Sequence, residues 1–218
     1  SNASSSAQLA RLYPEAGGTY IYARKVLGNS SSLIAGTTFI VGKIISSIAI
    51  ALTFGHYLYP SSHKIAGIAL VFIIGAVSYF GASKTASVAK WFVYSVLGIL
   101  LFYIFSVVSS DNFDFAIPIT KGLTVESLLL SSSIWFFAFT GYSRLATFGE
   151  EVENPETIIP KAILTGLGIT VSIYFLTTYA TLGIINPDII QNSLTPLKVA
   201  FDISRFSNFS FLISIAST

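Results

Sequence analysis

The feature that most restricts the fold of this chain is a series of long apolar runs separated by polar connectors. A helix that spans a bilayer needs about 20 mostly apolar residues. The sequence offers five such candidates, at residues 33–59, 65–80, 88–108, 125–148 and 159–185. Only 10% of the residues are charged and the mean hydropathy is +0.74, whereas soluble domains carry about 25% charged residues. The sequence therefore predicts an all-α, polytopic membrane helix bundle.

The two ends of the chain have the composition of further, incomplete spans. Residues 1–13 indicate the tail of an earlier helix, and residues 206–218 indicate the start of a later one. We therefore expect residues 1–218 to form a single transmembrane domain that is incomplete, with its first helix and its C-terminal helices missing. Within the connector at residues 186–205, we expect an amphipathic surface helix over residues 193–201.

The distribution of Lys and Arg predicts the orientation of the spans, because cytoplasmic loops carry an excess of both. One side carries the basic residues Arg11, Arg24, Lys25, Lys84, Lys90, Arg144 and Lys161. The other side carries Lys64, Lys121, Lys198 and Arg205. We expect the first side to be cytoplasmic, in a multi-pass protein of the cell membrane that has the lipid bilayer as a partner.

The residue types that catalysis and metal binding require are scarce in this chain. It has no Cys, which excludes disulfides and cysteine-ligated metals. Its two histidines, His56 and His63, fall at a predicted helix end and in a loop, where we expect interfacial positions. No catalytic triad, metal-ligand cluster or phosphate-binding loop is recognisable. The net charge of +2 comes from scattered basic residues, which does not favour nucleic-acid binding. We expect neither an enzyme nor a cofactor.

Lys43 is the one ionisable residue deep within a predicted span. A lysine near the bilayer centre costs about 2.5–3.5 kcal/mol on insertion scales and therefore needs a physical reason. Ser46 and Ser47 share its helical face, whereas Ile45 lies on the apolar opposite face, so Lys43 is predicted to point into the bundle. With Ser46 and Ser47 it forms a candidate coupling site, because a desolvated lysine holds its proton less tightly. The alternative is a structural lysine that binds backbone carbonyls or reaches the interface.

The fourth run contains a predicted helix break at Thr140-Gly141. A break inside a membrane frees backbone groups, and these are tolerated only beside protein or a water-filled cavity. Transporters build substrate sites from such broken helices. The aromatic residues of the stretch 136–142 would give an apolar wall and a cation–π surface for an amine, and freed carbonyls would accept from its ammonium group. The alternative is an ordinary helix with one packing glycine.

An acidic loop follows the break and contains Glu150 and Glu151. Asn154 and Pro155, which suit the N-cap and the first position of a helix, predict where the next helix begins. Glu150 and Glu151 are candidates for a cytoplasmic gate, and the alternative is a solvated acidic loop. Their candidate cationic partners are Arg24, Lys25 and Arg144.

Two sequence blocks together indicate a known family. The first runs from Ala7 to Tyr22, contains Tyr-Pro-Glu-Ala-Gly-Gly, and is followed by Gly28. The second block consists of Phe136-Phe-Ala-Phe-Thr-Gly-Tyr142, Glu150-Glu151, Asn154-Pro155 and Ile159-Pro160. In order and spacing they resemble the second helix with its following loop, and the broken sixth helix with its following loop, of the amino acid–polyamine–organocation (APC) permease superfamily. The resemblance covers essentially the whole chain, from the second helix to the beginning of the eighth.

The resemblance implies a partial five-plus-five inverted-repeat transporter fold with a broken sixth helix. It also implies secondary transport of amino acids or related amines by alternating access. Carried over position by position, the residues that would line the substrate site are Phe136, Phe137, Ala138, Phe139, Thr140 and Gly141. The backbone there would meet the amino group of the substrate. The family's first helix, which binds the carboxylate, is absent from this sequence, so no carboxylate contact is assigned.

The resemblance also bears on substrate and coupling. Few charges lie near the visible site, which favours a zwitterion or a small amine over an anion. We expect coupling to protons, or exchange, rather than sodium. Some sodium-independent relatives are thought to use a lysine in the fifth helix, but the matching span here has Lys90 only at its entrance, so Lys43 is the candidate for a chemically related role. The alternative function is a transporter-like amino acid sensor or a non-transporting membrane subunit.

Overall fold

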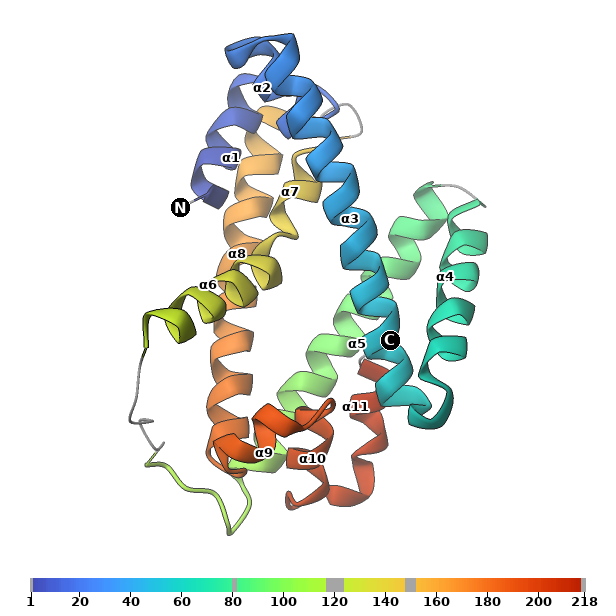
Figure 1. Cartoon of the computed structure of the whole chain (residues 1–218), viewed down its shortest axis with the longest axis vertical. Coiled ribbons are helices and arrows are strands. Elements are labelled where there is room, and N and C mark those ends of the chain that lie inside the picture. The colour runs from blue at the N-terminus through green and yellow to red at the C-terminus, as the bar shows by residue number, and fades with distance from the viewer. Residues whose placement is uncertain (1, 80–81, 117–123, 148–151, 217–218) are drawn as a thin grey trace. The chain divides into compact units, whose positions relative to one another are not determined.

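The computed structural model describes residues 2–79, 82–116, 124–147 and 152–216, and for residues 82–88 it describes the backbone alone. Every regular element in these ranges is a helix (Figure 1). The chain divides into two compact units, of which unit 1 comprises residues 1–43 and 119–172 and unit 2 comprises residues 44–118 and 173–218. Two long helices, α3 (Asn29–Leu58) and α8 (Pro155–Leu182), contribute to both units. The all-α class predicted from the sequence is confirmed.

Unit 1 is organised around a face of small residues. Besides the first parts of α3 and α8, its helices are α1 (Asn2–Leu12), α2 (Thr19–Leu27), α6 (Val125–Phe139) and α7 (Tyr142–Leu145). Ala3, Ala7 and Ala10 recur every three to four residues and bury one side of α1. They cluster with Ile159 and Ile163 of α8, so small side chains on one helix receive branched side chains from another.

Unit 2 has a larger core that includes two hydroxyl pairs. Besides the second parts of α3 and α8, it contains η1 (Pro60–Ser62), α4 (His63–Tyr79), α5 (Ala82–Val108), α9 (Pro187–Asn192), α10 (Pro196–Asp202), η2 (Ser207–Phe209) and α11 (Phe211–Ala216). The Tyr103 hydroxyl lies 2.7 Å from Thr181 Oγ1, and Ser106 Oγ lies 2.7 Å from Ser204 Oγ. These bonds satisfy polar groups that would be costly to bury alone.

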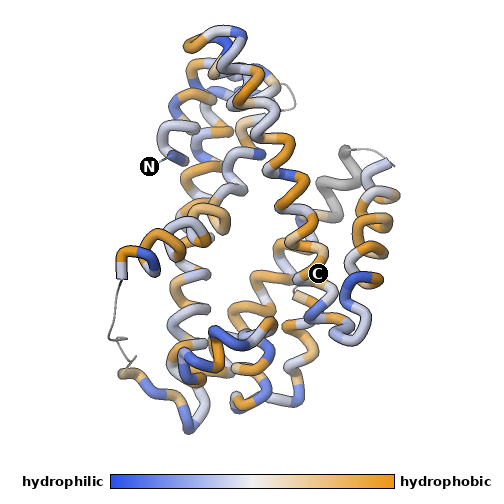
Figure 2. Tube along the Cα trace, viewed as in Figure 1, coloured by the Kyte–Doolittle hydropathy of each residue, from blue (hydrophilic) through white to orange (hydrophobic). Residues whose placement is uncertain are grey.

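Four helical segments of the described chain are long and apolar enough to cross a membrane: Asn29–Leu58, Pro60–Tyr79, Ala89–Val108 and Pro155–Leu182. They match four of the five predicted runs to within a few residues. In Figure 2 the hydrophobic colouring covers most of α4, with polar residues at its end next to η1. The fifth run, residues 125–148, does not form one span, because α6 has only 15 residues and ends at Phe139.

Two local predictions about connectors can be compared with the structure. Helix α8 begins at Pro155, the residue predicted to be its first. The expected amphipathic helix over residues 193–201 is present as α10, but Ala200 and Phe201 are fully buried in the core of unit 2. The apolar face of α10 therefore packs against protein rather than against a membrane surface. The amphipathic pattern of the segment alone cannot distinguish these two environments.

Candidate functional site

The predicted helix break is present at the predicted residues. Helix α6 ends at Phe139 and α7 begins at Tyr142, with Thr140 and Gly141 between them. The backbone N–H groups of Thr140, Ser143 and Arg144 donate to carbonyls three residues back, at 3.2, 3.2 and 3.1 Å. This is the tighter 3₁₀ pattern, which marks hinges and strained stretches within helices. The chain therefore loses the regular α-helical bonding at this point.

Side-chain hydroxyls supply additional bonds to the carbonyls of this stretch. Thr140 Oγ1 donates to Phe137 O at 2.8 Å, and Ser143 Oγ donates to Thr140 O at 2.7 Å. Phe137 O also accepts from the Thr140 N–H at 3.2 Å, so both of its lone pairs are used. The sequence predicts that freed carbonyls of this stretch accept from a substrate ammonium group, and in the structure the Thr140 hydroxyl bonds one of these carbonyls, Phe137 O.

The predicted substrate-lining residues differ in their exposure. Phe136 and Phe137 are 58% and 48% exposed, whereas Ala138, Phe139 and Thr140 are half-buried. The ring of Phe139 stacks on Trp135 with centroids 5.6 Å apart. These phenylalanines therefore offer apolar and aromatic surface next to the break.

Gly141 is exposed, and it does not serve as a packing glycine within the described structure. A Cβ placed on it would meet no atom within 4 Å. Its φ of −56° and ψ of −31° are also accessible to any residue. Close helix packing therefore does not explain a glycine at this position. The effect of the glycine is to leave the backbone at residue 141 uncovered by a side chain.

Lys43, the candidate coupling residue, lies in the middle of α3. Its side chain is half-buried, and its Nζ lies 5.6 Å from the centre of the Phe39 ring. Ser46, one turn further along α3, is also half-buried, whereas Ser47 is exposed and Ile45 on the opposite face is 59% exposed. A cation over an aromatic face is stabilised electrostatically, which offsets part of the cost of placing a lysine in an apolar helix.

The predicted cytoplasmic gate is described only in part. Arg144 is exposed on α7, directly after the break, whereas Glu150 and Glu151 lie outside the described residues. Lys25, a candidate partner of these glutamates, forms an ion pair with Glu15 and lies 5.4 Å from the centre of the Tyr13 ring. The sequence analysis did not predict this pair, although the Gly17-Gly18 turn between its two residues gives a signal for it.

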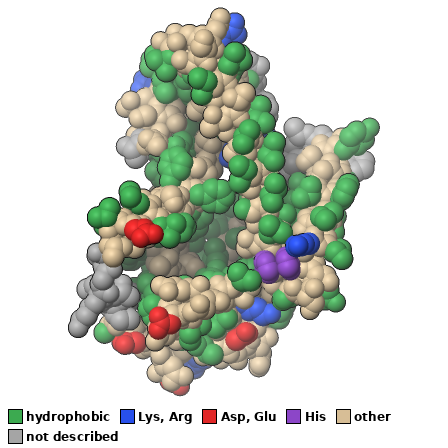
Figure 3. Space-filling model, in the orientation of Figure 1, with side chains coloured by type: hydrophobic (Ala, Val, Ile, Leu, Met, Phe, Trp, Pro, Cys, Tyr) green, Lys and Arg blue, Asp and Glu red, His purple; other side chains and the backbone are tan. Residues whose placement is uncertain are grey.

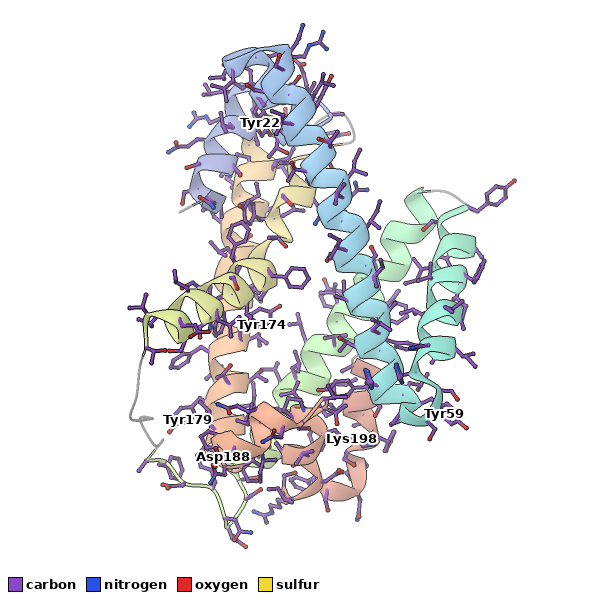
Figure 4. All side chains as sticks on the ribbon, in the orientation of Figure 1. Tyr22, Tyr59, Tyr174, Tyr179, Asp188 and Lys198 are labelled. Atoms are coloured by element: carbon purple, nitrogen blue, oxygen red, sulfur yellow. The ribbon has the colours of Figure 1, made fainter. Side chains whose placement is uncertain are left out.

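Tyr22 is a buried residue that the sequence analysis did not single out. It is 4% exposed and belongs to the cluster formed with α1 and α8 (Figure 4). Among the described residues its hydroxyl has no hydrogen-bond partner, and burial raises the pKa of that hydroxyl. An unsatisfied buried hydroxyl is costly, so Tyr22 marks a point where this part of unit 1 is not optimised for stability alone.

Comparison with known proteins identifies the family. The amino acid permease family model matches residues 3–217. An uncharacterised transporter of Mycobacterium tuberculosis is 38% identical over 98% of this chain and 48% of its own length. The putrescine transporter PotE of Haemophilus influenzae is 27% identical over 89% of this chain and 47% of its own length. The low-affinity putrescine importer PlaP of Escherichia coli is 24% identical over 79% of this chain and 41% of its own length. The chain thus spans about half the length of the curated relatives it matches, and it belongs to the amino acid permease family.

Proposed function

We propose that the intact protein is a secondary active transporter of the cell membrane that moves amino acids or related amines by alternating access. The observation that carries this proposal is the interruption of the helix at Thr140 and Gly141, within a chain that the amino acid permease model matches from residue 3 to residue 217. A broken helix is how membrane transporters expose backbone groups to a substrate.

The substrate is an amine-bearing molecule, either a zwitterionic amino acid or a small polyamine. Phe136 and Phe137 present exposed aromatic surface beside the break, and aromatic faces attract ammonium groups. Two of the relatives named above are transporters of putrescine, a small amine. An anionic substrate is disfavoured, because α6 carries its acidic residue, Glu126, in its first turn and has no basic residue in its last turn.

Coupling to protons, or exchange of one substrate for another, involves Lys43 with Ser46 and Ser47. The support for this role is the position of Lys43, half-buried on α3 beside Phe39. On the cytoplasmic side, Arg144 closes the pathway with Glu150 and Glu151.

The experiment that tests this function is uptake by the intact protein in proteoliposomes, with labelled amino acids and amines, an imposed proton gradient and no sodium. We expect saturable accumulation that is driven by the gradient or by preloaded substrate. In Lys43→Ala, gradient-driven accumulation should fall to the level of exchange alone. The matched control Lys161→Ala, which removes an exposed lysine from α8, should behave as wild type.

Two outcomes would contradict this proposal in different ways. Unchanged gradient-driven uptake in Lys43→Ala would refute the coupling role and leave transport standing. Saturable binding without flux of any member of the panel would refute transport and favour a sensor.

A further inference from the structure

Helices α3 and α4 enclose a groove within unit 2 that is apolar apart from one lysine. Its volume is about 340 Å³. Ile48 and Leu52 of α3 form one wall, and Val71 and Phe72 of α4 form the other. Lys64, in the first turn of α4, also lines it. The groove belongs to neither the helix break nor the Lys43 site.

Two glycines allow α3 and α4 to approach closely at and beside this groove. A Cβ on Gly67 of α4 would lie 2.7 Å from Ala51 O of α3, so the two backbones touch there. Gly55 likewise abuts the backbone of His63 at the turn between the helices. Because no side chain fits at these contacts, α3 and α4 can approach closely, and Gly67 lies directly in the lining of the groove.

The walls of the groove are open within the described residues. Ile68, Val71 and Phe72 are 58%, 54% and 74% exposed, and Figure 3 shows green hydrophobic side chains, interspersed with tan atoms, along α3 and α4. From Lys64 to Phe72 the groove follows α4 for about 12 Å, at 1.5 Å per residue. The hydrocarbon core of a bilayer is about 30 Å thick, so the groove is slightly shorter than one leaflet.

The charge at that end is positive and has no acidic neighbour in the hairpin. Residues 44–79 contain no Asp or Glu, and among the described residues Lys64 has no carboxylate partner. The rings of His56 and His63 stack 4.1 Å apart at the same turn and appear as the purple pair in Figure 3, with a basic side chain beside them. If this turn lies at the membrane interface, the ammonium group of Lys64 stands at the open end of the apolar groove.

We infer that the groove binds an anionic phospholipid. One acyl chain lies along Ile48, Val71 and Phe72, and the phosphate meets the ammonium group of Lys64. The length of the groove and its apolar walls match an acyl chain. The positive charge of Lys64 matches the phosphate of the headgroup. This site is independent of the transport function and would persist if the substrate assignment failed.

The test uses the intact protein in a neutral detergent, with phosphatidylglycerol and phosphatidylcholine of identical acyl chains added, and native mass spectrometry to count retained lipids. We expect phosphatidylglycerol to be retained about five-fold more than phosphatidylcholine, the effect of one lysine at an anionic headgroup. Lys64→Gln should abolish this preference, whereas Lys198→Gln, outside the groove, should preserve it. Val71→Trp fills the groove and should reduce retention of both lipids.

A photo-crosslinker at position 71, in liposomes of the same lipids, separates the possible occupants. Capture of lipid supports the proposal. Capture of another segment of the intact chain, or of a second copy, would overturn it, because protein would then cover the groove. Equal retention of the two lipids by the wild-type protein, or an unchanged preference in Lys64→Gln, would overturn it as well.

Discussion

Replacing Gly141 by alanine tests whether the helix break must open for transport. In the structure Gly141 has helical φ and ψ angles, and an added Cβ would meet no atom within 4 Å. Alanine therefore fits without a clash. Because glycine in a helix is less stable than alanine by about 0.5–1 kcal/mol, the substitution should stabilise the helical form of the break by that amount.

This magnitude sets the expected kinetic effect. If substrate binding requires residues 140 and 141 to leave the helical conformation, the added 0.5–1 kcal/mol should raise KM about two- to five-fold. The melting temperature should stay the same or rise slightly. The measurement is concentration-dependent uptake in proteoliposomes, together with thermal unfolding of the same preparation in detergent.

Gly166→Ala is the matched control for this experiment. Gly166 lies within α8, and a Cβ there would also meet nothing within 4 Å. It should gain the same helical stabilisation without any change in KM. The reasoning would be refuted if Gly141→Ala transported with the wild-type KM, or if both variants raised KM equally.

Three further substitutions test the packing described above. Tyr22→Phe removes a buried hydroxyl without a described partner and should stabilise the protein by about 1 kcal/mol. Because burial raises the pKa of Tyr22, its neutral form contributes stability below the ordinary tyrosine pKa of about 10, and that contribution is lost at higher pH. Melting curves at rising alkaline pH should therefore decline less steeply in Tyr22→Phe, and an equal decline would contradict this. Ser204→Ala breaks the 2.7 Å bond to Ser106 and should cost about 0.5–1.5 kcal/mol in denaturant titration, whereas no loss would show that the bond adds nothing. Gly183→Ala would place a Cβ 2.9 Å from Asp114 O and should lower the free energy of unfolding by about 1–3 kcal/mol. The control Gly168→Ala, whose Cβ would meet no atom within 4 Å, should not lower it. Similar melting temperatures for the two variants would contradict the close packing at Gly183.

The apolar runs predicted the long helices well, because the length and polarity of a span are properties of its own residues. Helices α3, α4 and α8 begin and end within a few residues of the predicted runs. The break at Thr140 was predictable for the same reason. The bonding at the break was not, because it depends on the rotamer by which the Thr140 hydroxyl reaches Phe137 O.

Features that depend on how two segments pack together could not be predicted from the composition of each segment alone. The groove between α3 and α4 requires Gly55 and Gly67 to face the partner helix, and the turn between the helices sets that register. The pair between Glu15 and Lys25 depends on the intervening turn, in which Gly17 and Gly18 have φ angles of +121° and +51°. The two adjacent glycines predict a turn, but the ion pair between Glu15 and Lys25 depends on the geometry of that turn.

The hydrogen bonds of the hydroxyl groups at the break affect how tightly this site could bind a substrate. Under the proposed function, a substrate ammonium group that reaches Phe137 O would have to displace the Thr140 hydroxyl, which donates to this oxygen at 2.8 Å. One hydrogen bond is exchanged for another, so the net gain is far smaller than the full strength of the new bond. In the transporter proposed here, the same hydroxyl would return when the substrate leaves, which would lower the barrier to release. Such a site would favour rapid turnover over tight binding.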